Sequence, residues 1–354
     1  MRRTTAIAFS LALISVAITL VAGVIPVRGS ESLPDLFDAA SMVFAGEIIS
    51  VKQTGERDGY WRGRQVRLQL FTATAIVERR YKGQSDAASV EITYNRPLGT
   101  LCTVSKCESF SPGEYGLFFL SRQGDSYQLL DPYFGVFPAS RLKSGGYRPG
   151  IAGLEADLIT GLRDTDTKRL LTNIELIGAL GHVESVSPLL DLLANNSNKM
   201  VRGAIYATLL RLHDYGKLRE SLDLVEGPAE DSADLATREQ ILDLVSEIHD
   251  PTTLQVLVGF SRSHSDRLRE CVIHALRGIG AAQAVPIFVD ALDDPVQMIR
   301  YDAVLGLATV VRDWSLAPSV EAFAANERKY IEAWKAWWVN SGRKTYRRAG
   351  SSMG

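Results

Sequence analysis

The side chains that could carry out chemistry are scattered along this sequence and are not gathered into a catalytic motif. Glu47, Glu78 and Asp131 could serve an enzyme as acids or bases, but isolated carboxylates of this kind are usually solvated. The sequence contains no G-x-S-x-G, H-E-x-x-H, P-loop or glycine-rich dinucleotide motif. It therefore predicts a protein that is not an enzyme and that needs no cofactor.

The three cysteines are too few for a disulfide scaffold. Cys102 and Cys107 enclose four residues, and in an oxidising compartment such a pair would close a loop through a structural disulfide. Two free thiols, or a metal or redox pair, are the alternatives. Cys271 and His274 would share one helix face as half of a metal site. Because no other residue supplies the second half, we expect Cys271 to be a lone thiol, at a position that need not be deeply buried, and we predict no metal site.

Four segments between Met200 and Arg312 repeat one apolar pattern around an arginine. When these arginines are placed in register, apolar residues recur one position before and three, seven and ten positions after each of them, except that Thr237 replaces the first in one copy. Steps of three and four residues describe one face of a helix. The spacing is 31 residues between the last three arginines and 36 between the first two. The four arginines are Arg202, Arg238, Arg269 and Arg300.

A period of this length is typical of a solenoid, in which each unit buries its apolar face only against its neighbours. The run Asp293-Asp294-Pro295, followed by Ile299, Arg300, Ala303, Val304 and Leu307, resembles HEAT repeats of the 31-residue kind also seen in phycobilisome-lyase-like proteins. The resemblance spans about Arg169 to Val311. It implies that each arginine pairs with an acidic residue of the neighbouring unit and holds the stack together. Contact with a ligand is the alternative role for the four arginines.

Two features beside the repeats could contact a partner. The longer spacing between Arg202 and Arg238 accommodates an acidic loop at Glu226–Ala236, and irregular loops on regular scaffolds often carry binding. After the last repeat, an aromatic helix that ends near Gly342 could cap the open face of the solenoid or contact a partner or a membrane surface. The candidate contacts are Glu226, Glu230, Asp231, Trp334, Trp337 and Trp338.

The first thirty residues are interpreted as an export signal. Arg2 and Arg3 precede an apolar run from Ala6 to Val27, with small residues around Gly29. The run is also just long enough for an uncleaved membrane anchor. We therefore expect an exported protein, periplasmic or extracellular, that the N-terminal segment could anchor to the membrane. The net charge of −2 gives no global field that would favour nucleic acid.

Residues 31–143 show the alternating pattern of β-strands and no helical period. Five or six strands are expected, beginning with Val43 to Val51, and a polar stretch at 55–64 should form a hairpin loop. This composition favours a small antiparallel barrel or sandwich. From Leu33 to Pro138 the strand MVFAGEIISV, the RRYKG at Arg79–Gly83, the VEITY strand, Cys102, the SPGEYGLFFL segment and the closing GVFP together resemble the OB-like module of netrins and tissue inhibitors of metalloproteinases. The inhibitors begin with a zinc-binding cysteine, which no residue near Glu31 supplies.

The expected chain is therefore multidomain, with a small antiparallel OB-like β-barrel followed by an all-α HEAT-repeat solenoid. The predicted parts are the signal or anchor (1–30), the barrel (31–143), a linker (144–160), the solenoid (161–316), a Trp-rich capping helix (317–342) and a basic disordered tail (343–354). The predicted function is that of a non-enzymatic scaffold that binds a protein partner, with no role for nucleic acid. A protease inhibitor or regulator acting through the barrel is the alternative. Contact with a membrane or cell-envelope surface is a further alternative for partner binding.

Overall fold

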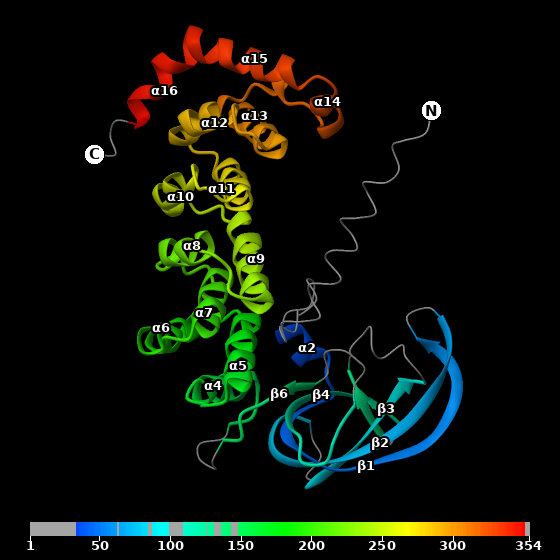
Figure 1. Ribbon diagram of the computed structural model, residues 1–354. Helices are drawn as coiled ribbons and strands as arrows, with labels where there is room; N and C mark the ends of the chain where they lie inside the picture. The colour runs from blue at the N-terminus through cyan, green and yellow to red at the C-terminus, as the bar shows by residue number, and fades with distance from the viewer. Residues whose placement is uncertain are drawn as a thin grey trace. The chain divides into compact units, whose positions relative to one another are not determined.

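The computed structural model describes residues 33–61, 64–83, 87–98, 109–124, 126–130, 136–142 and 148–350 (Figure 1). The predicted export segment, Asp131 and the pair Cys102 and Cys107 lie outside these residues. The chain divides between Thr208 and Leu209 into two compact units, which we call the N-terminal unit and the C-terminal unit. Among the described helices, none is both long enough and apolar enough to cross a membrane.

The N-terminal unit begins with a short helix that the strand pattern did not predict, and a six-stranded sheet follows it. Leu33, Leu36 and Phe37 of this helix are buried, and their spacing of three and four residues is helical. The elements are α2 (Leu33–Ala39), β1 (Met42–Trp61), β2 (Arg64–Lys82), β3 (Ser89–Pro97), β4 (Tyr115–Gln123), β5 (Ser126–Leu129) and β6 (Val136–Pro138).

The strand pairings run in a circuit. β1 pairs with β2 along its length and with β4 through Met42 to Glu47, and both pairings are antiparallel. β2 pairs with β3, β3 pairs in parallel with β5, and β5 pairs with β4, which brings the circuit back to β1. β6 adds to β4. The core beneath β1 and β4 includes Phe44 stacked on Phe118, with ring centroids 4.8 Å apart.

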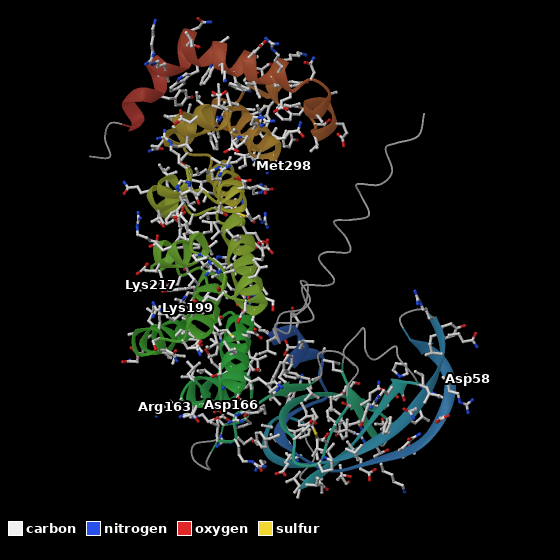
Figure 2. All side chains as sticks on the ribbon, in the orientation of Figure 1. Asp58, Arg163, Asp166, Lys199, Lys217 and Met298 are labelled. Atoms are coloured by element: carbon white, nitrogen blue, oxygen red, sulfur yellow. The ribbon has the colours of Figure 1, made fainter. Side chains whose placement is uncertain are left out.

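The hairpin loop expected at 55–64 is wrong, because residues 55–61 continue β1 and Arg64 already belongs to β2. The glycines and charged residues that suggested a loop lie instead in a paired ribbon (Figure 2). A Cβ on Gly59 would come within 2.7 Å of the Leu68 side chain, so a larger residue there would require that side chain to move. Asp58 is strongly exposed on this ribbon.

Four helices complete the N-terminal unit and the division falls within the last of them. They are α4 (Ile151–Gly161), α5 (Thr167–Leu180), α6 (Val186–Asn195) and α7 (Lys199–Arg211), with a 3-10 turn at Val183–Ser185. The linker predicted at 144–160 is therefore wrong from residue 151 onward. Leu154 and Leu158 of α4 are buried at helical spacing, a signal that the neighbouring glycines of the sequence obscured.

The C-terminal unit consists of paired helices. Figure 1 shows the first helices of successive pairs, α9, α11 and α13, along one side and the second helices, α8, α10 and α12, along the other. Their bounds are α8 (Leu218–Glu226), α9 (Ser232–Ser246), α10 (Leu254–Phe260), α11 (Asp266–Ile279), α12 (Val285–Ala291) and α13 (Gln297–Val311), with 3-10 turns at Pro251–Thr253, Ala282–Ala284 and Trp314–Leu316.

The apolar register read from the arginines fits the helices of the repeats. The residues one before and three and seven after Arg269 are Leu268, Val272 and Leu276, and all three are fully buried. The equivalent residues around Arg300 are fully buried too. The last apolar position, Ile279 or Val310, is partly exposed in these two copies, whereas its equivalents Leu212 and Ile248 are buried.

The chain ends in a helical segment that includes part of the predicted disordered tail. Its elements are α14 (Val320–Ala325), α15 (Glu327–Trp337), a π-helical turn (Trp338–Gly342) and α16 (Arg343–Gly350). The prediction of disorder is wrong for residues 343–350. The high charge of this stretch concealed Tyr346, whose ring packs against Trp337 with centroids 5.9 Å apart.

Candidate functional site

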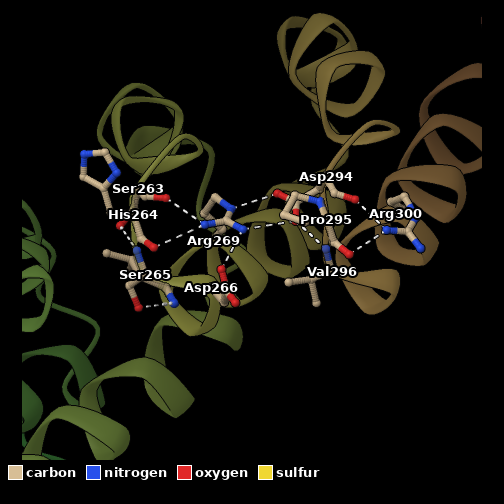
Figure 3. Close-up of polar contacts among 10 residues, drawn as sticks. Ser263, His264, Ser265, Asp266, Arg269, Asp294, Pro295, Val296 and Arg300 are labelled. Atoms are coloured by element: carbon tan, nitrogen blue, oxygen red, sulfur yellow. Dashed lines mark hydrogen bonds and ion pairs between the residues drawn. The ribbon is translucent and has the colours of Figure 1, made fainter.

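A network of hydrogen bonds and ion pairs in the C-terminal unit surrounds Arg269 and Arg300 (Figure 3). Arg269 donates to both carboxylate oxygens of Asp294 in the next repeat, at 2.8 and 3.1 Å, and to the carbonyl oxygen of Ser263 at 2.9 Å. Arg300 donates to the carbonyl oxygens of Asp294 and Pro295 and forms an ion pair with Glu327. Each arginine thus satisfies carbonyl groups at the end of the preceding helix and reaches an acidic residue further along the chain.

Arg202 and Arg238 make the first kind of contact but not the second. Arg202 donates to the carbonyl oxygen of Leu193 at 2.9 Å and to the hydroxyl of Tyr206 at 2.8 Å. Arg238 is buried, donates to the carbonyl oxygens of Val225 and Pro228, and pairs with Asp234 of its own helix at 2.8 Å. The predicted pairing with a neighbouring unit is therefore seen for Arg269 and Arg300 only.

The ion pair between Arg269 and Asp294 should make stability depend on pH. Burial alone would raise the pKa of Asp294, but the hydrogen bonds from Arg269 and from the Val296 amide lower it below its ordinary value. A lowered folded-state pKa stabilises the protein above the unfolded-state pKa of about 4, and this stabilisation is lost as the pH falls through the folded-state value.

We therefore expect Asp294→Asn to lower the free energy of unfolding by about 2 kcal/mol at neutral pH, because it removes a charge-assisted hydrogen bond. Urea unfolding at pH 7 and at pH 3 would show that the difference from the parent shrinks in acid. Asp293→Asn is the control, since Asp293 is exposed and its pair with Lys335 lies at the surface. An equal loss in both variants would contradict this assignment.

The acidic loop is held by its own residues. The Asp231 carboxylate accepts from the amide of Asp234 and caps α9, and the Asp234 carboxylate accepts from the amide of Glu230. Glu226 is the last residue of α8 and is exposed. All three candidate contacts of this loop are exposed, and Asp231 in addition caps α9.

The three candidate tryptophans differ in exposure. Trp334 is fully buried and donates from Nε1 to the carbonyl oxygen of Leu316 at 3.4 Å. Trp337 lies edge-on to Trp334, with centroids 5.3 Å apart, and Trp338 follows it, partly exposed. Trp334 is thus unavailable to a partner in the folded protein, whereas Trp338 presents part of its ring.

Sequence reasoning missed a row of charged and apolar residues along the first helices of the repeats. Arg267 on α11 pairs with Asp243 of α9 at 2.7 Å and with Glu239 at 3.3 Å. His274 lies one turn further on from Cys271, and its Nδ1 is 3.2 Å from the carboxylate of Asp302 on α13. Met298, exposed on α13, occupies the position of Arg267 one repeat later (Figure 2). We call Glu239, Asp243, Arg267, His274 and Met298 the first-helix ridge.

Cys271 is a free thiol, as predicted, but its position is deeply buried. Its side chain is buried, and burial raises the pKa of the thiol to about 12, which leaves it unreactive. His274 turns to Asp302 instead. Within the described ranges no group of three histidine, cysteine, aspartate or glutamate side chains could hold a metal ion.

In the N-terminal unit a buried ion pair connects the sheet to α4. Arg79 on β2 donates to both carboxylate oxygens of Asp157 on α4, each at 2.8 Å, and the Tyr81 hydroxyl donates to the same carboxylate at 2.7 Å. Burial and this hydrogen bond raise the pKa of Tyr81 well above its usual range. The residues lie 76 and 78 positions apart, so no local pattern in the sequence announces the contact.

Two of the isolated carboxylates meet in the fold. Glu47 and Glu78 both form ion pairs with Arg141, which also lies over the ring of Tyr115 at 4.8 Å. A cleft of about 900 Å³ beside Arg141 is bordered by Arg163, Asp164 and Arg169. Arg141 thus bridges the two carboxylates, and the three side chains form an ion-pair cluster.

The match to a family model agrees with the helical part of this description. Residues 224–308 match the family model of HEAT repeats. A designed armadillo repeat protein is 16% identical over 56% of this chain and 98% of its own, with a TM-score of 0.33. Two proteins described as engineered are 15% and 16% identical, cover 53% and 56% of this chain and 54% and 78% of their own, and have TM-scores of 0.30 and 0.22. No curated protein matched the chain.

The C-terminal region is a HEAT-like repeat solenoid. The family match falls on α9 to α13, the helices that carry Arg238, Arg269 and Arg300. The repeats predicted from the apolar register are therefore confirmed as a helical repeat region. Folds of this kind commonly serve as scaffolds for protein interaction, because their stacked helices present an extended surface.

Proposed function

We propose that this protein is an exported, non-enzymatic scaffold that binds a protein partner through the first-helix ridge of its C-terminal unit. The observation that carries the proposal is that the charged residues of the repeats fall into two groups, one bonded inside the stack and one exposed. The arginine network around Arg269 and Arg300 is turned toward helix ends and partly buried acids. The charged residues Glu239, Asp243 and Arg267 of the ridge pair with one another but keep 41%, 68% and 42% of their side chains exposed, so a partner can contact them.

The chemistry of the ridge favours a protein surface of mixed charge. Arg267 and Asp243 are 42% and 68% exposed and stand side by side, so a partner could meet both signs within a few ångströms. Such charges set specificity and the rate of encounter. Met298 adds a flexible apolar side chain, a type suited to partner surfaces of varied shape. Arginine in particular is enriched among the residues that dominate binding energy.

For the N-terminal unit we propose an OB-like barrel of the netrin type. The support is the pairing circuit β1–β2–β3–β5–β4–β1 with its parallel β3–β5 contact, since a closed circuit of five strands is the arrangement of a small barrel. The buried pair of Arg79 and Asp157 fixes α4 against this sheet. Export and the mature N-terminus, on which inhibition of a protease would depend, concern residues outside those that the structure describes.

Site-specific photo-crosslinking in the native host tests the scaffold proposal. A photoreactive amino acid replaces Met298 on the ridge, and in a second strain it replaces Arg262, which is 80% exposed at the end of a second helix. We expect a defined protein adduct from position 298 and none, or different ones, from position 262. The same adducts from both positions, or none from either, would remove the support for the ridge. Fractionation of the same cells would test export.

A further inference from the structure

The charge of the chain is unevenly distributed toward its C-terminus. The whole sequence carries a net charge of −2, yet residues 333–354 contain five basic residues and no acidic one. Such an asymmetry indicates a segment that meets a polyanion. The five basic residues are Lys335, Arg343, Lys344, Arg347 and Arg348.

The fold holds part of this segment as a helix with a fixed inner side. α16 packs against α12 and the turn at Ala282–Ala284, and Tyr346 packs on Trp337. A Cβ on Gly342 would lie 2.6 Å from the Trp337 ring, so glycine at this position allows the close approach. The exposed side of α16 is therefore presented in a defined orientation and needs no ordering upon binding.

The outer side carries basic groups without a counterion. Arg343 and Lys344 are exposed, and neither has an ion pair within the described part of the chain. Two basic residues of α15 do have acidic partners, since Arg328 pairs with Glu332 and Lys335 pairs with Asp293. The excess positive charge therefore lies at the start of α16.

An apolar surface adjoins these charges. Val339 is 71% exposed and lies one helical turn before Arg343, and the partly exposed Trp338 stands beside it. Both border a cleft of about 540 Å³ in which the acidic residues Asp290 and Asp293 are paired with Arg262 and Lys335. Basic residues next to a partly exposed tryptophan and an exposed aliphatic residue are the composition of a helix that lies at the interface of a bilayer.

We propose that this segment docks on an anionic phospholipid bilayer, with Arg343 and Lys344 against the headgroups and Trp338 and Val339 at the level of the acyl boundary. Charge complementarity identifies an anionic occupant, and the exposed apolar pair favours a bilayer over a soluble polyanion. The proposal does not depend on the scaffold function of the first-helix ridge, which lies on other helices.

The test follows the segment itself, so that the apolar N-terminus cannot mask the result. The full-length chain is mixed with vesicles of phosphatidylcholine, with or without phosphatidylglycerol, and amide hydrogen exchange is measured for residues 338–350. We expect exchange to slow only when phosphatidylglycerol is present. Because each basic residue near an anionic surface strengthens binding about fivefold, R343E/K344E should raise the lipid concentration at half-protection by about 30-fold or more. Raising the salt concentration should weaken the protection in the parent.

The matched control is R328E/K329E, which makes the same charge change at the exposed start of α15. It should leave the half-protecting concentration within about twofold of the parent, since exposed charges beyond a Debye length contribute little. Equal protection on both kinds of vesicle, or an equal loss in the control variant, would overturn the proposal. So would equal protection by dextran sulfate without lipid, which would identify a soluble polyanion as the occupant.

Discussion

Replacing Trp334 by alanine is expected to lower the free energy of unfolding of the C-terminal unit by about 3–5 kcal/mol. Trp334 is fully buried, lies edge-on to Trp337 and donates from its indole nitrogen to the carbonyl oxygen of Leu316. The substitution leaves a cavity between the last helices and also leaves that acceptor unpaired. Denaturant unfolding followed by circular dichroism would measure the loss.

Trp314 provides the control for this experiment. It is the same residue type in the same unit, but it is 64% exposed. Trp314→Ala should therefore change the free energy of unfolding by less than about 0.5 kcal/mol, as surface substitutions usually do. Equal effects of the two substitutions would show that the aromatic helix does not close the end of the repeats.

Asp157→Ala is expected to cost the N-terminal unit about 3–5 kcal/mol, because it leaves the buried guanidinium of Arg79 without a counterion. The side chains of Arg79 and Asp157 are 7% and 14% exposed, so water can replace little of the lost interaction. The hydroxyl of Tyr81 loses its acceptor as well. Hydrogen exchange should show that β2 and α4 lose protection together.

A double-mutant cycle separates the ion pair from general damage to the core. Arg79→Ala removes the other partner, and Asp157→Ala made in that background should cost much less than in the parent. Asp58→Ala is the surface comparison, since its contact with Arg67 is 3.7 Å long and both residues are exposed. If Asp157→Ala lowers the free energy of unfolding equally in the parent and in the Arg79→Ala background, the sheet and α4 are not coupled through this pair.

The sequence predicted best what local periodicity encodes. The helical faces of the repeats could be read from Leu268, Val272 and Leu276, because each is a few residues from the next and all serve one core. The strands were found for the same reason, and their pairing circuit was not, since Ile92 meets Tyr127 only in the fold. The alternating pattern also cannot show that a ribbon continues through Gly55 and Gly59.

Contacts between distant residues account for most of what was missed. Arg79 and Asp157, or Glu47 and Arg141, leave no trace in spacing, because nothing in a single sequence relates one charge to another so far away. The linker predicted over α4 and the disorder predicted over α16 were wrong for a different reason. Glycines before α4 and charges in α16 outweighed the few apolar residues, such as Leu154 and Tyr346, that decide the local structure.

The network around Arg269 and Arg300 also implies that successive steps of the stack differ in how strongly salt affects them. The carboxylate of Asp294 accepts a hydrogen bond from Arg269, and its carbonyl oxygen accepts one from Arg300. Asp294 follows α12, so this one residue links α11, α12 and α13. One repeat earlier, Ser263 stands in the place of Asp294, and Arg238 donates to carbonyl oxygens at the end of α8 and pairs with Asp234 of its own helix. Arg267 of α11 forms partly exposed ion pairs with Glu239 and Asp243 of α9, and salt weakens pairs of this kind. Salt should therefore weaken the ion pairs at the step from α9 to α11 more than the pair of Arg269 and Asp294, whose side chains are only 11% and 10% exposed.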